Sequence, residues 1–129
     1  MTSPKAELAK PLVTDIGHVI LQVGNMDQAL QLYRDVLGFE LLADRSSSPV
    51  WKVIKTKRGE LTLLQAEKLT PLVLRDGEDT PLTLHVASFE EAMDELEKRG
   101  YNVQRQNKHS GTLVDPWNNL IGLHDHLEG

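Results

Sequence analysis

Histidines are the residues of this 129-residue chain best suited to chemistry, and two of them lie two positions apart near its end. His124 and His126 fall within the segment NNLIGLHDH, residues 118–126, whose composition is typical of a β-strand. Side chains two apart on a strand point to the same face, and imidazoles so placed suit zinc, nickel or iron. Gly122, the preceding residue on that face, offers no third donor. Two hypotheses therefore stand, a metal centre and a metal-free binding site, and the pattern favours the second.

Charge and composition exclude several classes of partner. The net charge is −5 and the 14 Lys and Arg residues are spread thinly, so we expect no nucleic-acid partner. No apolar run approaches roughly 18 residues, and we expect no membrane partner. The chain has no cysteine, which excludes disulfides, thiolate ligands and a cysteine nucleophile. No phosphate-binding loop or dinucleotide fingerprint is present, and no secretory signal precedes the first strand, so we expect no cofactor and a cytoplasmic location.

One strand, one helix and three further strands must position the residues of the first half. Asp15 begins a strand rich in β-branched residues, which Gly24 and Asn25 end. Apolar residues at helical spacing then predict an amphipathic helix that Gly38 ends in the left-handed conformation. Strand composition returns in three segments, residues 39–45, 50–57 and 60–67.

The same order of elements recurs in the second half, after a linker that contains two prolines. A strand is predicted at 82–86, followed by a helix in which Ser88 is the expected N-cap and Glu91 completes a capping box. Three more strand segments follow, residues 101–106, 111–116 and 118–126. The repeated order predicts a duplicated βαβββ module.

The two halves also align along their helices, since matching Val23 to Val86 places Tyr33 opposite Leu96. The predicted organisation is a lead-in at 1–14, a first module at 15–69, a linker at 70–80 and a second module at 81–128. Eight helix residues are expected to pack between the helices and the sheets: Met26, Ala29, Leu30, Tyr33, Phe89, Ala92, Met93 and Leu96.

Two sequence blocks carry a resemblance to a known family. HVILQVGNMDQALQLYRDVLGFELL, from His18, and DPWNNLIGLHD, from Asp115, resemble the vicinal oxygen chelate superfamily, which includes glyoxalase I, bleomycin-resistance proteins, fosfomycin-resistance enzymes and extradiol dioxygenases. The resemblance covers Asp15 to about His126. It implies an α+β fold in which two βαβββ modules form a U-shaped cup of mixed sheet with the helices packed outside.

The resemblance also indicates where a metal would bind in the metal-dependent members. Of the four ligand positions, the first-strand histidine matches His18, whereas the second histidine position falls on Pro81. The two carboxylate positions fall on Thr62 and Gly122. A single imidazole cannot hold a metal at useful affinity, so we expect no metal at this site.

Two alternatives remain open at this point. A displaced metal site could use His18, Glu60, His85 and His124, which share strand parity with the ligand positions, and would support a metal-dependent lyase or dioxygenase. Against it, His85 lies four residues, roughly 13 Å, along its strand from the expected position. The other alternative is a lyase or isomerase of the glyoxalase type, with His18, His85 or Glu60 as general acid or base and no assigned catalytic residue.

The favoured function is a metal-free cup that holds a small organic molecule by apolar and aromatic contacts. The net charge of −5 would suit a cationic ligand. Trp117 is expected to be exposed or to cover a pocket or subunit boundary, and the resemblance implies a homodimer, with pairing of modules within or between chains left open. Strand parity predicts the residues that line the cup: His18, Ile20, Gln22, Trp51, Thr62, Leu64, Thr83, His85 and His124.

Overall fold

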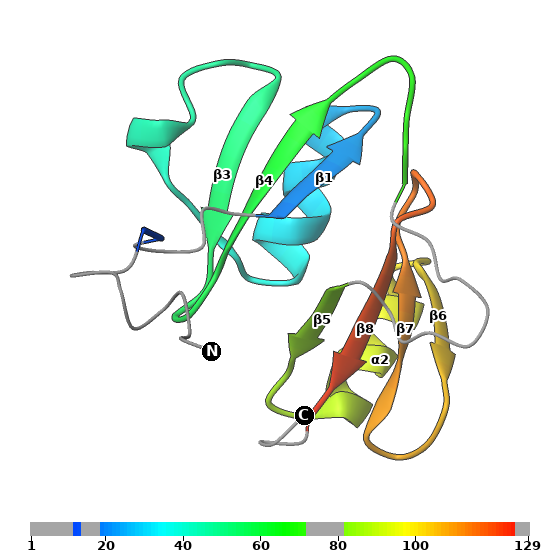
Figure 1. Ribbon diagram of the computed structural model, residues 1–129. Helices are drawn as coiled ribbons and strands as arrows, with labels where there is room; N and C mark the ends of the chain where they lie inside the picture. The colour runs from blue at the N-terminus through cyan, green and yellow to red at the C-terminus, as the bar shows by residue number, and fades with distance from the viewer. Residues whose placement is uncertain (1–11, 14–18, 72–81, 126–129) are drawn as a thin grey trace, which may run out of the picture.

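Three parts of the chain are described by the structure, a computed structural model: residues 12–13, 19–71 and 82–125. His18, Pro81 and His126, which entered the predictions above, lie outside these ranges, as do most of the predicted lead-in and linker. The described residues form two four-stranded sheets, each with its own helix (Figure 1).

The first sheet has the strand order β1-β4-β3-β2 and belongs to the first half of the chain. Its members are β1 (Val19–Val23), β2 (Glu40–Leu41), β3 (Trp51–Lys55) and β4 (Glu60–Gln65). β1 runs parallel to β4, because the helix between β1 and β2 carries the chain across the sheet. The β4-β3 and β3-β2 pairs are antiparallel.

The second sheet repeats this scheme with the order β5-β8-β7-β6. Its members are β5 (Leu82–His85), β6 (Asn102–Arg105), β7 (Ser110–Val114) and β8 (Leu120–His124). β5 pairs in parallel with β8, and the other two pairs are antiparallel. The predicted α+β class and the duplicated βαβββ order are confirmed.

Both predicted helices are present, with the predicted cap at Ser88 and the predicted stop at Gly38. Asn25 caps the first helix by accepting a hydrogen bond from Gln28 N at 2.9 Å, and Ser88 caps the second by accepting one from Glu91 N at 3.3 Å. Gly38, just after the first helix, has a φ of +89°, which is the left-handed conformation expected of it.

The first helix is less regular than predicted. α1 (Met26–Leu30) continues as the π-helix η2 (Gln31–Val36), whereas α2 (Phe89–Lys98) is α-helical throughout. The wider turn is visible in the hydrogen bond from Leu37 N to Leu32 O, five residues back, at 2.8 Å. Tyr33 lies in this π-helical segment, where its hydroxyl reaches the second module.

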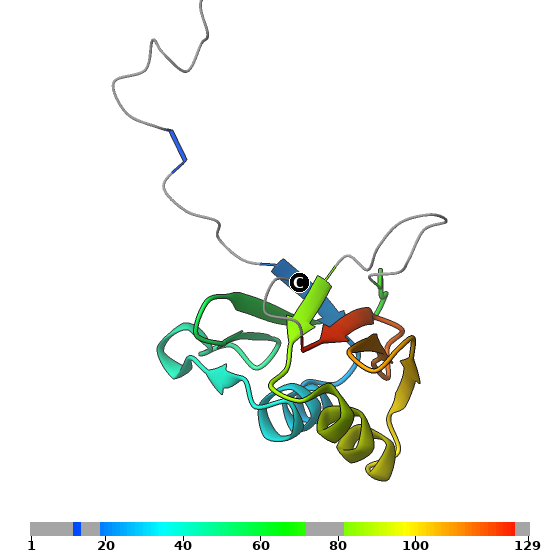
Figure 2. The same ribbon diagram turned by 90° about the horizontal axis from the view of Figure 1, so that it is seen from below.

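One hydrophobic core joins the two modules. Both helices pack against the same side of the two sheets, and no helix of the described residues covers the opposite side (Figure 2). The prediction for the helices is confirmed for seven of its eight residues, and Ala92 is half-buried. Residues of both halves, among them Leu21, Leu63, Leu113 and Ile121, belong to the same buried cluster.

The sheets stay open and do not curl into one continuous U within the described residues. β1 and β5 are edge strands, each hydrogen-bonded to a single neighbouring strand among the described residues. The predicted pair of βαβββ modules is therefore confirmed. The two sheets are open and do not form the predicted U, because no ladder joins β1 to β5 in the described residues.

Candidate functional site

The side of each sheet that faces away from the helices is the candidate binding surface, called the open face below. In β1, Leu21 and Val23 are fully buried against the helices, so Ile20 and Gln22 lie on the open face. The ladder extends this face across the sheet. Gln22 pairs with Leu64 of β4, which in turn pairs with Trp51 of β3.

The residues of the first open face differ in accessibility. Ile20 is 42% exposed, and Trp51 and Leu64 are half-buried. Thr62 is 0% exposed and is thus a buried residue in this conformation. The amide of Gln22 is engaged, because its Oε1 accepts a hydrogen bond from Thr70 N at 2.7 Å.

The open face of the second sheet is polar. Leu82 and Leu84 pack toward the core, which places Thr83 and His85 on the open face of β5. Thr83 pairs with Gly122, and His85 pairs with His124. The two imidazole rings are in edge-to-face contact, with centroids 5.6 Å apart and ring planes at 82°. His124 Nδ1 is buried and has no hydrogen-bond partner.

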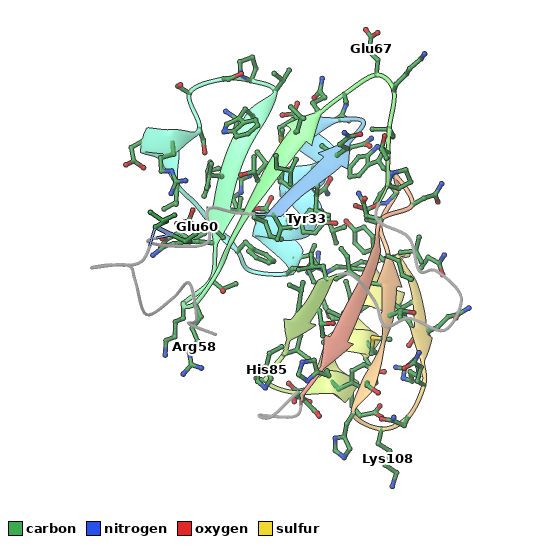
Figure 3. The ribbon with its side chains drawn as sticks, in the orientation of Figure 1. Tyr33, Arg58, Glu60, Glu67, His85 and Lys108 are labelled. Atoms are coloured by element: carbon green, nitrogen blue, oxygen red, sulfur yellow. The ribbon has the colours of Figure 1, made fainter. Side chains whose placement is uncertain are left out.

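The predicted lining residues are thus divided between two surfaces. Five of them, Ile20, Gln22, Trp51, Thr62 and Leu64, belong to the first sheet, and Thr83, His85 and His124 belong to the second. Figure 3 shows His85 on the second module and Glu60 on the first. The ninth residue, His18, lies outside the described residues.

The residues at the family's metal positions do not fit a metal ion where the structure describes them. Thr62 is fully buried and carries a hydroxyl in place of a carboxylate, and Gly122 carries no side chain. Of the residues of the displaced alternative, Glu60 accepts a 2.8 Å hydrogen bond from Arg45, which lies between β2 and β3. No group of three or more His, Asp or Glu side chains within 12–13, 19–71 and 82–125 is placed to hold a metal.

A buried polar network joins the two modules, and sequence reasoning did not predict it. Tyr33 donates its hydroxyl hydrogen bond to Asp115 Oδ2 at 2.7 Å. Asp115 is 2% exposed and also accepts from Trp117 N at 2.9 Å and from the backbone N and side-chain Nδ2 of Asn119 at 2.8 and 2.9 Å. Asn119 Nδ2 further donates to Gln22 O at 2.9 Å. The network therefore ties the helix and first strand of one module to the turn before β8 of the other.

The electrostatics of this network follow from burial. Removal from water raises the pKa of the Tyr33 hydroxyl far above its ordinary value, and the charge and hydrogen bond of Asp115 raise it further. Tyr33 consequently stays protonated and acts as a donor. The Asp115-Pro116 turn carried part of the family resemblance, but no spacing rule connects it to a tyrosine 82 residues earlier.

Trp117 covers the junction between the modules. It is half-buried and packs against the core, and a Cβ added to Gly24 would lie 2.6 Å from its Nε1. The glycine after β1 therefore leaves room for the indole of the second module. Trp117 was expected to be exposed or to cover a pocket or a subunit boundary. In the structure it covers a boundary between the two modules of one chain.

His109 and Asp125 form a second surface pair near the end of β8. His109 Nδ1 lies 2.8 Å from Asp125 Oδ1, and the other carboxylate oxygen of Asp125 accepts from Phe89 N at 3.0 Å. The carboxylate of Asp125 therefore stabilises the N-terminus of α2, where the backbone N–H groups carry partial positive charge. His109 lies immediately before β7.

No described helix is long and apolar enough to cross a membrane. No curated protein sequence matches the chain significantly.

Solved structures with the same fold come from several bacteria. A member of the glyoxalase/bleomycin resistance protein/dioxygenase superfamily from Sphaerobacter thermophilus is similar with a TM-score of 0.68 and 19% identity, covering 90% of this chain and 100% of that one. A genomically encoded fosfomycin resistance protein from Listeria monocytogenes has a TM-score of 0.69 and 16% identity, with coverage of 91% and 98%. An antibiotic binding protein from a Streptomyces species has a TM-score of 0.62 and 24% identity, with coverage of 88% and 98%. At these identities the likeness shows the fold alone.

The sequence itself carries the assignment to a family. The sequence profile described as Glyoxalase/Bleomycin resistance protein/Dioxygenase superfamily matches residues 15–128, which is nearly the whole chain. The match includes both βαβββ modules and the Asp115 turn that joins them. This chain therefore belongs to the glyoxalase/bleomycin resistance protein/dioxygenase superfamily.

Proposed function

We propose that this protein binds a small organic molecule without a metal at the family position. The observation that carries the proposal is the apolar surface on the first open face, where Trp51, Leu64 and Gln22 form one row across three strands and Ile20 lies beside it. A flat apolar ligand would bury apolar area and stack on the ring there, while the Nε2 group of Gln22, whose Oε1 is bonded to Thr70 N, would supply a polar contact at the end of the row.

Loss of the metal donors supports binding over metal-dependent chemistry. Thr62 and Gly122 stand where the metal-dependent members have carboxylates, and neither replaces one. One structural neighbour is described as an antibiotic binding protein, which makes sequestration of a small molecule a suitable function for this scaffold. The net charge of −5 favours a neutral or cationic ligand over an anionic one.

General acid and base catalysis is the alternative. Glu60 is poorly suited to act as a base, because its carboxylate is paired with Arg45 at 2.8 Å. His85 is exposed on the second open face and is the described residue best placed for proton transfer. Turnover of a bound compound that His85→Ala abolishes, with binding retained, would favour this alternative.

A homodimer in the cytoplasm is the assembly that we propose. β1 and β5 each pair on one side only, and Val19 and Ile20 of β1 are 41% and 42% exposed. An exposed apolar edge strand is normally covered by a partner. Two chains that cover each other's edges would also close the open faces into cups. Analytical ultracentrifugation should give twice the mass of 14.5 kDa, and a concentration-independent monomer would contradict the proposal.

Tryptophan emission tests the binding site directly. Chelator-treated protein would first be screened for thermal stabilisation with aromatic metabolites and antibiotics. A compound that binds the first open face should quench or shift the emission of Trp51. Trp51→Phe should remove this response, and Trp117→Phe, the matched control at the module junction, should leave most of it. A response carried wholly by Trp117 would place the site elsewhere.

A further inference from the structure

His85 and His124 form an isolated pair of imidazoles at the ends of β5 and β8. They are register partners in a parallel ladder, and both side chains lie on the open face of the second sheet. The two rings contact each other edge to face, and His124 Nδ1 is buried without a hydrogen-bond partner. A buried nitrogen without a hydrogen-bond partner destabilises a fold, so the arrangement calls for an explanation.

The separation of the two rings matches that of imidazoles sharing a metal ion. With a metal-to-nitrogen distance of about 2.0 to 2.1 Å and tetrahedral geometry, the centroids of two coordinating rings lie roughly 5 Å apart. The observed separation is 5.6 Å, with the ring planes nearly perpendicular. Binding would require both side chains to rotate from this edge-to-face contact, so that one nitrogen of each ring faces a common ion. A metal bond would also give His124 Nδ1 the partner that it lacks.

We propose that His85 and His124 bind a divalent first-row transition metal ion, such as Cu²⁺, Ni²⁺ or Zn²⁺. The site is distinct from the family's metal position, whose described members Thr62 and Gly122 are no donors. His85 is exposed, which leaves the ion a path from solvent.

Two protein ligands define the character of this site. Within the described part of the chain no third His, Asp or Glu is placed to complete a metal-binding group, so water or a small ligand would fill the other positions. Structural zinc sites use four protein ligands, and a two-ligand site is weak and exchanges its ion readily. The metal should therefore bind on titration and be lost on dialysis. The inference does not depend on the small-molecule function proposed above.

Titration of the full chain, without an affinity tag and after chelator treatment, tests the proposal. We expect one Cu²⁺ per chain by calorimetry, with Ni²⁺ and Zn²⁺ binding more weakly, as the general order of metal affinities requires. Electron paramagnetic resonance of the copper complex should show two coordinated nitrogens. His85→Ala and His124→Ala should each weaken binding by about tenfold or more, because either change leaves a single imidazole.

Two variants serve as matched controls. His109→Ala removes a neighbouring exposed imidazole, and His126→Ala removes the other histidine of the final segment; both should bind copper as the natural chain does. Loss of binding in His126→Ala with none in His85→Ala would assign the metal to a different pair and overturn the proposal. Unchanged binding in His85→Ala would overturn it as well, and that exposed position allows the variant to fold, which circular dichroism would verify.

Discussion

The two modules have the same strand pairing but differ at equivalent helix positions. Tyr33 of the first and Leu96 of the second align in sequence and are both almost fully buried. Leu96 packs by apolar contact alone, whereas Tyr33 also donates a hydrogen bond to Asp115 of the other module. The helix thus has the same position in both modules. In the first module alone, a side-chain hydroxyl of the helix forms a hydrogen bond to the other module.

The open faces differ in the same way. The open face of the first sheet carries Ile20, Trp51 and Leu64. The open face of the second sheet carries Thr83, His85 and His124. Residues that face the helices are apolar in both modules, because one core requires them. The open faces are free of this requirement, and they are where the modules acquired different chemistry.

The largest effect is expected from breaking the polar connection at its centre. Asp115→Ala removes the acceptor of four hydrogen bonds and leaves buried donors of Tyr33 and Asn119 unpaired. The free energy of unfolding should fall by about 3 to 5 kcal/mol, measured by urea denaturation. Asp35→Ala, which removes an exposed carboxylate paired with Arg34, should change it by under about 0.5 kcal/mol. Equal effects of the two variants would show that the network does not hold the modules together.

The second largest effect is expected at the apolar counterpart. Leu96→Ala leaves a cavity in the core beneath the second sheet and should reduce stability by about 3 kcal/mol. Glu95→Ala on the exposed side of the same helix is the control and should have little effect, since its pair with Arg99 is solvent-exposed. A loss below about 1 kcal/mol for Leu96→Ala would contradict the equivalence of the two buried positions.

Local patterns predicted the scaffold but could not predict contacts between distant segments. Asn25, Ser88 and Gly38 act through hydrogen bonds or backbone angles of their own neighbourhood, and the sequence shows them directly. The bond between Tyr33 and Asp115 depends on how the two modules dock, which no periodicity encodes. The available signal was that Tyr33, whose hydroxyl needs a hydrogen-bond partner when buried, aligns with Leu96 on the core-facing side of the second helix.

The candidate site shows the same limit. Strand parity predicted that Ile20, Gln22 and Trp51 line one cup together with His85 and His124. The ladders put the first three on one sheet and the two histidines on the other, and their role in binding stays a prediction. Parity does not say whether a residue is reachable, and Thr62 proved fully buried. Strand parity also does not predict how two sheets are arranged, because the curvature of a sheet and its pairing with another sheet arise from tertiary and quaternary packing.

A smaller effect is expected from the hydroxyl of Tyr33 alone. Tyr33→Phe keeps the ring in the core and removes one of four donors to Asp115, so stability at pH 7 should fall by about 1 kcal/mol. Tyr101→Phe, at a half-buried position, is the matched control and should be close to neutral.

The pH dependence of that difference sharpens the comparison. The pKa of Tyr33 is raised in the folded protein, first by burial and then by Asp115, so the folded state keeps a proton that the unfolded chain releases above about pH 10. The stability that Tyr33 contributes is therefore present below pH 10 and declines above it. The gap between the natural chain and Tyr33→Phe should narrow in urea titrations between pH 9 and 11. A gap that widens with pH would contradict a buried, protonated hydroxyl.

Removal of metal is expected to have no effect on the stability of the protein. Thr62 and Gly122 provide no carboxylate at the family positions, and the pair His85 and His124 offers two ligands that would hold an ion only weakly. Protein purified without an affinity tag and dialysed should carry well under one equivalent of zinc, nickel, manganese or iron by elemental analysis. Excess chelator should leave the melting temperature unchanged, because a fold without a tightly bound metal loses no linked stability when the metal is withdrawn. About one equivalent of tightly held metal, lost together with thermal stability in His18→Ala, would contradict metal-free binding and favour a metalloenzyme.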